Sequence, residues 1–247
     1  SARNPVGMLS FGMEGSLLAT KGLIVAASLV AIAAGGGGYA YFKQTSAPAP
    51  IASTQVAAAS GPKVAQGLMP EIAADDMVLG SPDAKVTIVE YASLTCPHCA
   101  RFHKETMPKL KSEFIDTGKV KFVYREVYFD KFGLWAAIVA RCGGPEKYFG
   151  ISDILYDHQK DWLASNDEKG IADALKKIGL SAGMTEDQVN ACLNDNDQAK
   201  AMVTAYQTNA TNDNVQGTPT FLINGESHSG EMTYAEFAAL LDAKLKN

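Results

Sequence analysis

The pattern of apolar and polar positions separates an N-terminal apolar run from a linker and a larger mixed region. Residues 22–42 carry no charged side chain between Lys21 and Lys43. As a helix this run would be about 31 Å long, which matches the hydrocarbon core of a bilayer. It predicts a membrane anchor after a cytoplasmic tail at 1–21, or a signal segment removed after export; a buried core helix is the remaining alternative. We favour the anchor, because no small-x-small cleavage site closely follows the apolar core.

Residues 43–75 are predicted to be a linker or arm. Much of this stretch is a Pro, Ala and Ser tract that lacks the large apolar side chains needed to offset ordering entropy. The segment that follows this tract, residues 68–80, has three open interpretations. It could be a short ordering arm, an oligomerisation element or the lead-in to a first strand.

From residue 76 onward the pattern alternates between strand-like and helix-like segments. The runs at 85–91 and 120–127 are rich in β-branched residues and predict buried strands. Between them, residues 101–115 carry apolar side chains at near-helical spacing. A strand, helix, strand order predicts a parallel pair joined by a right-handed crossover.

No comparable strand pattern occurs between about 132 and 212, which predicts an inserted helical region. Ser165 with Glu168, and Thr185 with Gln188, have the spacing of a capping box. Gly179 is expected to end the first of these two helices.

Strand signals return near the end of the chain. Residues 220–223 and 226–229 flank an Asn-Gly dipeptide, which predicts a hairpin with a two-residue type I′ turn. Thr233 and Glu236 are expected to cap a last amphipathic helix. The element order is therefore βαβ, a helical insertion and then ββα, which is an α/β fold.

Composition and charge narrow the possible functions. The chain has 247 residues, of which 47% are hydrophobic and 20% charged, so a core can form and global disorder is excluded. Four cysteines are too few for a small disulfide-stapled scaffold. A formal net charge of -5 argues against a nucleic-acid partner, since phosphate binding needs a surplus of Lys and Arg on one face.

The segment with the clearest chemistry is Cys96-Pro97-His98-Cys99, between a predicted strand and a predicted helix. A cysteine on the first turn of a helix faces unpaired N–H groups and the positive end of the helix dipole, which favour its thiolate. Cys99 lies nearly one turn away and can resolve a mixed disulfide on Cys96. Pro97 suits a helix start, and His98 can further stabilise the thiolate.

Other uses of this CxxC segment are less favoured. A zinc site needs two more ligands, and although His103 is near, the sequence has no second CxxC and no HxxxH pair. Covalent haem attachment needs His directly after the second cysteine, where the chain has Ala100. We therefore expect no metal and no organic cofactor. His158 and His228 are interpreted as polar surface residues. His103, on the same helix as Cys99, is interpreted as a polar surface residue, with tuning of the thiol as the alternative.

These residues resemble the DsbA-like thiol-disulfide oxidoreductases of the bacterial periplasm. The resemblance covers about residues 76–247 and depends on the run 90–99, the helical insertion and the run 217–221. It implies a thioredoxin fold in which Cys96 is the nucleophile. It also implies an acidic residue buried beneath the redox centre, here Glu90.

The resemblance further implies a cis-proline at Pro219 that packs against the disulfide beside backbone that binds an extended substrate chain. Thr218 precedes this proline, where the best-known oxidases of the family have an apolar β-branched residue. Its hydroxyl could donate to the Cys96 thiolate or alter substrate release. Oxidase and isomerase activities therefore both remain open.

Cys142 and Cys192 lie in the predicted helical region, about 50 positions apart. In an oxidising compartment we expect a structural disulfide between them, an arrangement that resembles some alphaproteobacterial DsbA-like proteins. The alternative is two isolated buried thiols.

The sequence predicts a periplasmic enzyme, tethered to the inner membrane by residues 22–42 or secreted after signal cleavage. It would transfer its Cys96–Cys99 disulfide to reduced or misoxidised client proteins, and a DsbB-type membrane reoxidase would recharge it. One alternative is a disulfide isomerase that forms a homo-oligomer through the arm before Asp76. Another is a holdase that binds clients in a groove around Pro219.

Overall fold

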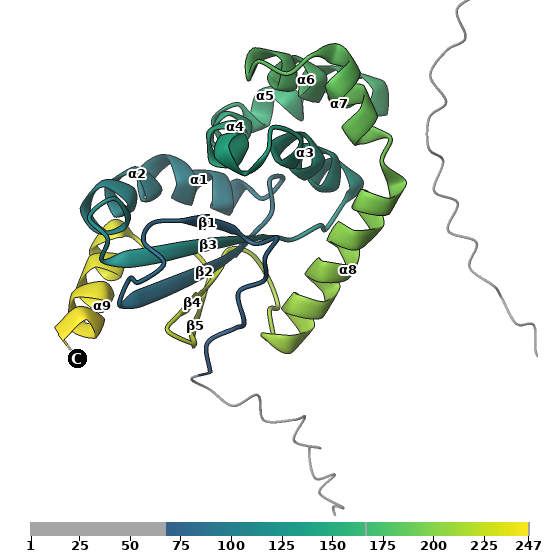
Figure 1. Cartoon of the computed structure of the whole chain (residues 1–247). Helices are drawn as coiled ribbons and strands as arrows, with labels where there is room; N and C mark the ends of the chain where they lie inside the picture. The colour runs from purple at the N-terminus through teal and green to yellow at the C-terminus, as the bar shows by residue number, and fades with distance from the viewer. Residues whose placement is uncertain (1–67, 166, 247) are drawn as a thin grey trace, which may run out of the picture. The chain divides into compact units, whose positions relative to one another are not determined.

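The computed structural model describes residues 68–165 and 167–246, whose strands form a five-stranded sheet with the order β1-β3-β2-β4-β5 (Figure 1). The central strands β2 and β3 are parallel, as the sequence predicts, and their neighbours are antiparallel. All seven residues of β2 are buried, as its run of β-branched residues predicts, and they include the charged residue Glu90. The strands are β1 (Met77–Leu79), β2 (Val86–Ala92), β3 (Val120–Glu126), β4 (Thr220–Ile223) and β5 (Glu226–Ser229).

The helices that follow β2 begin earlier and are shorter than the pattern at 101–115 predicts. Pro97 starts the first of them, and Pro108 has no N–H to continue a single helix through the next turn. The segment therefore divides into α1 (Pro97–Glu105), α2 (Met107–Leu110) and a π-helical turn, η1 (Lys111–Ile115).

Helices occupy the region between β3 and β4, where the sequence predicts a helical insertion. In Figure 1, α3 to α7 gather beyond one end of the sheet and α8 returns along its side. These helices are α3 (Lys131–Cys142), α4 (Pro145–Asp157), α5 (Gln159–Trp162), α6 (Glu168–Ser181), α7 (Glu186–Leu193) and α8 (Asn196–Asn212). The last helix is α9 (Tyr234–Lys246).

The start and end signals predicted for α6 are both wrong. Asp167, rather than Ser165, is the N-cap, and its carboxylate accepts a hydrogen bond of 2.7 Å from the Gly170 N–H. The helix also continues past Gly179 to Ser181. A Cβ at Gly179 would lie 2.7 Å from Val189 Cγ2, so this glycine allows α6 and α7 to approach closely.

Three other local predictions are confirmed. The Thr185 hydroxyl accepts from the Gln188 N–H at 3.2 Å while the Gln188 side chain accepts from the Thr185 N–H at 2.8 Å, which forms a capping box at the start of α7. In the β4–β5 turn, Asn224 and Gly225 have φ values of 48° and 82°, as a type I′ turn requires. Thr233 bonds reciprocally with Glu236 at the start of α9.

The sheet has apolar clusters on both faces. On the face covered by α1 and α9, the rings of Phe102, Phe221 and Phe237 lie 4.8 to 5.5 Å apart. On the other face, a smaller cluster around Val89 and Tyr91 packs against the arm before β1 and against α8. Successive residues of β2 therefore contact different parts of the chain, because side chains alternate between faces.

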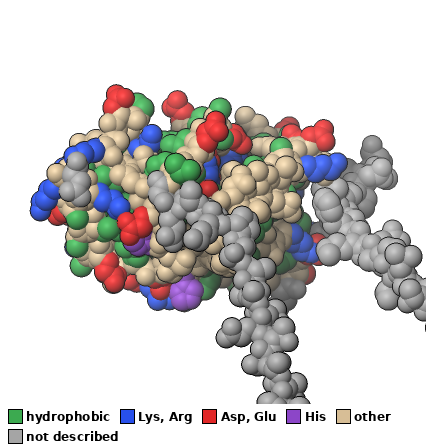
Figure 2. All heavy atoms as spheres, turned by 90° about the horizontal axis from the view of Figure 1, so that it is seen from below, with side chains coloured by type: hydrophobic (Ala, Val, Ile, Leu, Met, Phe, Trp, Pro, Cys, Tyr) green, Lys and Arg blue, Asp and Glu red, His purple; other side chains and the backbone are tan. Residues whose placement is uncertain are grey.

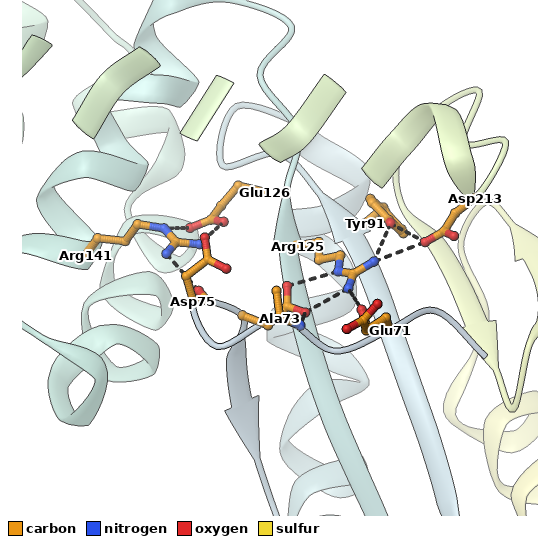
Figure 3. Close-up of polar contacts among 9 residues, drawn as sticks. Glu71, Ala73, Asp75, Tyr91, Arg125, Glu126, Arg141 and Asp213 are labelled. Carbon is orange, nitrogen blue, oxygen red and sulfur yellow. Dashed lines mark hydrogen bonds and ion pairs between the residues drawn. The ribbon is translucent and has the colours of Figure 1, made fainter. Parts of the chain in front are cut away.

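The segment that leads into β1 is held by a buried arginine, Arg125 of β3 (Figure 3). Its guanidinium donates to the Asp76 carboxylate at 2.8 and 3.0 Å and to the Glu71 carbonyl at 2.5 Å. It also donates to the Tyr91 hydroxyl at 2.9 Å and to Asp213 at 3.1 Å. Of the three interpretations of residues 68–80, the structure supports the lead-in to a strand, since β1 pairs with β3.

A second arginine, Arg141 of α3, extends this arrangement (Figure 3). Its guanidinium binds both carboxylate oxygens of Glu126 at 2.6 and 2.7 Å and donates to the Asp75 carbonyl at 3.0 Å. The two arginines together attach the arm to β3 and to the helical insertion.

A disulfide joins Cys142 at the end of α3 to Cys192 in α7, with 6.0 Å between the Cα atoms. This bond closes a loop with a sequence separation of 50 residues within the helical insertion.

Several sequence expectations fall outside the described residues: the tail at 1–21, the apolar run at 22–42 and most of the linker. Within residues 68–165 and 167–246, no helix is both long and apolar enough to span a bilayer. On the face shown in Figure 2, acidic and basic side chains are interspersed, which agrees with the small net charge.

We predict that Arg125→Ala lowers the free energy of unfolding by about 3 to 5 kcal/mol, because two largely buried carboxylates, Asp76 and Asp213, lose their cationic partner. Urea unfolding followed by circular dichroism measures this loss. Lys131→Ala is the control, since its ion pair with Glu168 is exposed and should contribute less than about 1 kcal/mol. Equal, small losses in the two variants would contradict a stabilising role for the buried arginine.

We also predict that replacing both Cys142 and Cys192 by Ala lowers the free energy of unfolding by about 4 kcal/mol. The bond restricts the unfolded chain, and the entropy of closing a loop of this length has that magnitude. Denaturant unfolding of the oxidised parent and the double variant gives the difference. Unfolding midpoints that coincide would show that this bond does not stabilise the fold.

Candidate functional site

The candidate site is the turn between β2 and α1, where Cys96 is the N-cap of the helix. Its backbone is extended, with φ −80° and ψ 120°, and its sulfur accepts from the Cys99 N–H at 3.4 Å. Pro97 occupies the first turn of α1. Cys96 is partly exposed, whereas Cys99 is fully buried, so only one of the two sulfurs is open to another protein.

The environment of Cys96 stabilises its thiolate. A hydrogen bond from the Cys99 thiol is the main reason that the pKa of Cys96 falls from 9.0 to about 5, although partial burial opposes the change. The Thr218 side chain and the backbone N–H groups of Cys99 and His98 lower this pKa further. At neutral pH the Cys96 sulfur is therefore an anion and a ready nucleophile.

The Cys99 thiol has the opposite tendency. Burial raises its pKa far above the usual value, and two further causes act in the same direction: its hydrogen bond to Cys96 and the negative charge of Glu90. The two sulfurs of the pair are thus strongly unequal in acidity, and Cys99 holds its proton.

Thr218 and Pro219 lie against the nucleophile, far from it in sequence. The peptide bond between them is cis, and the Thr218 carbonyl oxygen lies 3.6 Å from the Cys96 sulfur. The Thr218 hydroxyl is buried and has no hydrogen-bond partner among the described residues. It is therefore available to donate to the thiolate.

Beneath the pair, Glu90 of β2 is fully buried and its Oε2 lies 2.9 Å from His103 Nε2. The expectation that His103 is a surface residue is wrong. It is buried on the inner face of α1, one turn after Cys99, and its ring stacks on Tyr156 with centroids 4.3 Å apart. Its i, i+4 spacing from Cys99 was the sequence signal for this position.

Comparisons with known proteins agree with this geometry. A family model described as thioredoxin matches residues 73–243. The chain belongs to the thioredoxin family. Within it, the crystal structure of alpha-DsbA1 from Wolbachia pipientis is similar, with 28% identity and a TM-score of 0.65 over 71% of this chain and 93% of that one. The predicted thioredoxin fold with a helix-rich, DsbA-like architecture is confirmed.

Two curated relatives of this thioredoxin-family chain have names that refer to disulfide chemistry. A Rickettsia bellii protein named "Putative protein-disulfide oxidoreductase" is 39% identical over 154 residues, 61% of this chain and 58% of the relative. The chain thus spans little more than half of that relative's length. "Disulfide bond formation protein D" of Bacillus subtilis is 27% identical over 176 residues, 68% of this chain and 77% of the relative.

In this thioredoxin-family site, the helical insertion holds the Cys96 turn in place. Buried Gln159 of α5 donates to the carbonyls of Leu94 and Cys96 at 2.8 and 3.0 Å. Asp130, the N-cap of α3, accepts from the Thr95 hydroxyl at 2.7 Å. Sequence reasoning missed both residues, because no motif links them to the turn.

The His98 ring is engaged by an acidic residue that the sequence does not link to the site. His98 Nδ1 lies 3.0 Å from Glu231 Oε2, which also accepts from Arg101 at 2.9 Å. Glu231 comes from the loop between β5 and α9, far along the chain. The structure therefore relates His98 to the Cys96 thiolate through its backbone N–H rather than through a ring contact.

The remaining expectations concern histidines and metal. His158 is exposed and lies 3.0 Å from Asp161, and His228 is partly buried near Glu226. Across residues 68–165 and 167–246, no group of three or more His, Cys, Asp or Glu side chains could hold a metal ion.

We predict that alkylation of Cys96 by iodoacetamide in the reduced protein has a midpoint near pH 5, because the thiolate is the reactive form. Thr218→Val removes a donor and should move the midpoint toward neutral pH, whereas Thr117→Val on the surface should not. Mass spectrometry locates the label. A parental midpoint near pH 9, or identical midpoints in both variants, would contradict this account of the site.

The same shift makes the stability of the reduced protein depend on pH. Because folding lowers the pKa of Cys96, its contribution is fully present above the unfolded-state value near 9 and is lost as the pH falls through about 5. Denaturant unfolding of the reduced protein between these pH values should show this fall, and Cys96→Ser should remove it.

Proposed function

We propose that the protein is a thiol-disulfide oxidoreductase that introduces disulfides into client proteins. The observation that carries the proposal is the inequality of its two sulfurs. The pKa of Cys96 is lowered to about 5 at a partly exposed position, while burial raises the pKa of Cys99. A stable Cys96 thiolate stabilises the reduced form, which makes the Cys96–Cys99 disulfide a stronger oxidant.

Disulfide transfer then follows from the geometry. A client thiolate attacks the Cys96 sulfur, the bond to Cys99 breaks, and Cys99 leaves and takes up a proton. A second client thiolate attacks the client sulfur of this mixed disulfide and expels Cys96 as a thiolate. The client gains a disulfide and loses two electrons, and the enzyme pair is reduced.

Thr218 and Pro219 support binding of an extended client segment beside Cys96. The Thr218 carbonyl lies against the sulfur, so a client strand that pairs with this backbone would bring its own cysteine close to Cys96. Phe129 lies in the loop before α3, next to Asp130 in sequence, and is 60% exposed. It would offer the client segment an apolar contact.

We further propose that the enzyme works in the periplasm, where residues 22–42 would tether it to the inner membrane. A DsbB-type membrane reoxidase is the proposed partner that returns the reduced pair to the disulfide. The Cys142–Cys192 bond supports an oxidising compartment, because disulfides persist there and are rare in the cytosol.

Isomerase activity is an alternative function, because Thr218 occupies the position where the best-known oxidases of the family have an apolar β-branched residue. An isomerase needs a reduced Cys96 that attacks wrong client disulfides. A thiolate of low pKa is a weaker nucleophile and a better leaving group, which favours net oxidation over isomerisation. Assembly into a homo-oligomer and a holdase role for the groove around Pro219 are further alternatives.

Refolding of ribonuclease separates these functions. We expect the oxidised protein to restore activity to reduced, unfolded ribonuclease in glutathione buffer, and Cys96→Ser to lose this activity, because no mixed disulfide can form. Cys142→Ala with Cys192→Ala should retain it. Activity on scrambled ribonuclease without activity on the reduced form would reject the oxidase proposal. Suppression of client aggregation by Cys96→Ser, without redox turnover in the parent, would favour a holdase.

A further inference from the structure

Two oppositely charged side chains, Arg101 and Glu231, lie beside the redox pair and have no part in the exchange steps described above. Arg101 is on α1, five positions after Cys96, which is a rise of about 7.5 Å along a helix. Glu231 is in the loop between β5 and α9. A hydrogen bond of 2.9 Å from Arg101 Nη1 to Glu231 Oε2 joins the two side chains, so an ion pair connects α1 to this loop.

The loop that carries Glu231 is attached to the cis-proline segment. The Gly230 N–H donates to the Pro219 carbonyl at 2.8 Å, and Glu231 is the next residue. The Thr218 carbonyl in turn lies 3.6 Å from the Cys96 sulfur. Under the proposed function, an extended client segment pairs with this backbone. The residues on either side of the client cysteine would then lie near the ion pair.

Both charges are accessible to a bound client. The side chains of Arg101 and Glu231 are 52% and 28% exposed. A guanidinium carries five N–H donors, and across residues 68–165 and 167–246 that of Arg101 has Glu231 as its one hydrogen-bond partner. A charged client side chain can therefore approach either member of the pair.

The neighbouring charged groups do not cancel either member of the pair. His98 Nδ1 lies 3.0 Å from the same Glu231 oxygen, and the His98 side chain is 57% exposed. Lys104, further along α1, is directed away toward Asp157 of α4, where its ammonium donates to the Asp157 carbonyl at 3.1 Å. Within the described residues, the charge beside the redox pair is therefore set mainly by Arg101 against Glu231.

We infer that Arg101 and Glu231 determine which charges the site accepts beside a client cysteine. Arg101 attracts an acidic client residue and repels a basic one, whereas Glu231 does the reverse. Because the two charges are opposite and in contact, their effects on a client largely cancel, and the site accepts client segments of either charge. Both are specificity-determining residues for the proposed exchange function, on which this inference rests.

The experiment measures the reaction of the oxidised protein with two peptides that have capped ends. Each peptide has one cysteine, flanked by two Asp residues or by two Lys residues. The peptide thiolate attacks the Cys96 sulfur, the Cys96–Cys99 bond breaks, and Cys99 takes up a proton. A second peptide thiolate then expels Cys96, so two peptides lose two electrons and the pair is reduced. Acid quench and mass spectrometry at several times give the rate at which the oxidised pair is lost.

The measured quantity is the ratio of the rate with the Asp peptide to the rate with the Lys peptide, at pH 7 and low ionic strength. A variant that alters the reactivity of Cys96 or the stability of the fold changes both rates together and leaves the ratio as it is. A charge that acts on the client changes the two rates in opposite directions. The ratio therefore distinguishes charge selection from a merely structural role.

Glu231→Gln keeps an oxygen that can accept from Arg101 but removes the negative charge. We expect the ratio to rise at least about threefold above that of the parent, because the Arg101 charge is then unopposed. Arg101→Gln should lower the ratio at least about threefold. The variant with both changes should lie within about threefold of the parent. In 1 M salt, where the Debye length is about 3 Å, the shifts of the single variants should fall below about twofold.

Three control variants should keep the parental ratio. Lys104→Gln removes a cation of similar exposure from the same helix, and Glu226→Gln removes an exposed carboxylate from β5. Arg101→Lys retains the charge.

A shift of less than threefold in either single variant, or shifts in the same direction, would overturn the inference and leave the proposed function intact. Equal shifts in Lys104→Gln or Glu226→Gln, or shifts that persist in 1 M salt, would also overturn it. A parent that reacted with neither peptide would contradict the proposed function itself.

Discussion

The Cys96 sulfur keeps a negative charge because groups from two distant parts of the chain surround it and lower its pKa. The Cys99 thiol and the backbone N–H groups of His98 and Cys99 come from the first turn of α1. Thr218 comes from the segment before β4, more than a hundred residues later. A helix start by itself supplies only part of this stabilisation. The antiparallel pairing of β4 with β2 brings Thr218 beside the helix start, so the chemistry depends on the order of strands in the sheet.

The alternation of side chains along β2 explains how the sheet holds two separate polar systems. Glu90 faces α1 and meets His103 under the redox pair, while the next residue, Tyr91, faces the arm and bonds to Arg125. Successive residues of a strand point to opposite faces, which keeps the two systems apart. The first system lies beside the sulfurs, and the second attaches the N-terminal arm (Figure 3).

The helical insertion contacts the candidate site and also enlarges the hydrophobic core. Gln159 and Asp130 hold the carbonyls and the hydroxyl of the Cys96 turn, so the geometry of the nucleophile depends on helices inserted between β3 and β4. The Cys142–Cys192 bond lies within the insertion and ties α3, whose N-cap is Asp130, to α7. The insertion is therefore linked to the turn through two hydrogen-bonded side chains, Gln159 and Asp130.

The sequence correctly predicted those structural features that depend on contacts between near neighbours in the chain. The β-branched run before Cys96, the helix start at Pro97, the Asn-Gly turn and the Thr185 capping box all depend on neighbours within a few residues, and the structure contains each of them. The predicted cap at Ser165 and the predicted stop at Gly179 are wrong because of competing contacts. The Asp167 carboxylate accepts from the free N–H of Gly170 at the start of α6. Gly179 allows α7 to pack closely against α6, so it lies within the helix rather than at its end.

The tertiary structure alone decided the surroundings of the two sulfurs. His103 looks like a surface residue by polarity, yet a buried carboxylate and a stacked ring provide the partners that make its burial favourable. Glu231 reaches His98, and Thr218 reaches Cys96, only because the strand order folds the end of the chain back onto α1. The sequence by itself predicted Cys96, at the start of a helix, as the nucleophile. Long-range packing decided its acidity, since electrostatic stabilisation depends on distances that residue spacing does not contain.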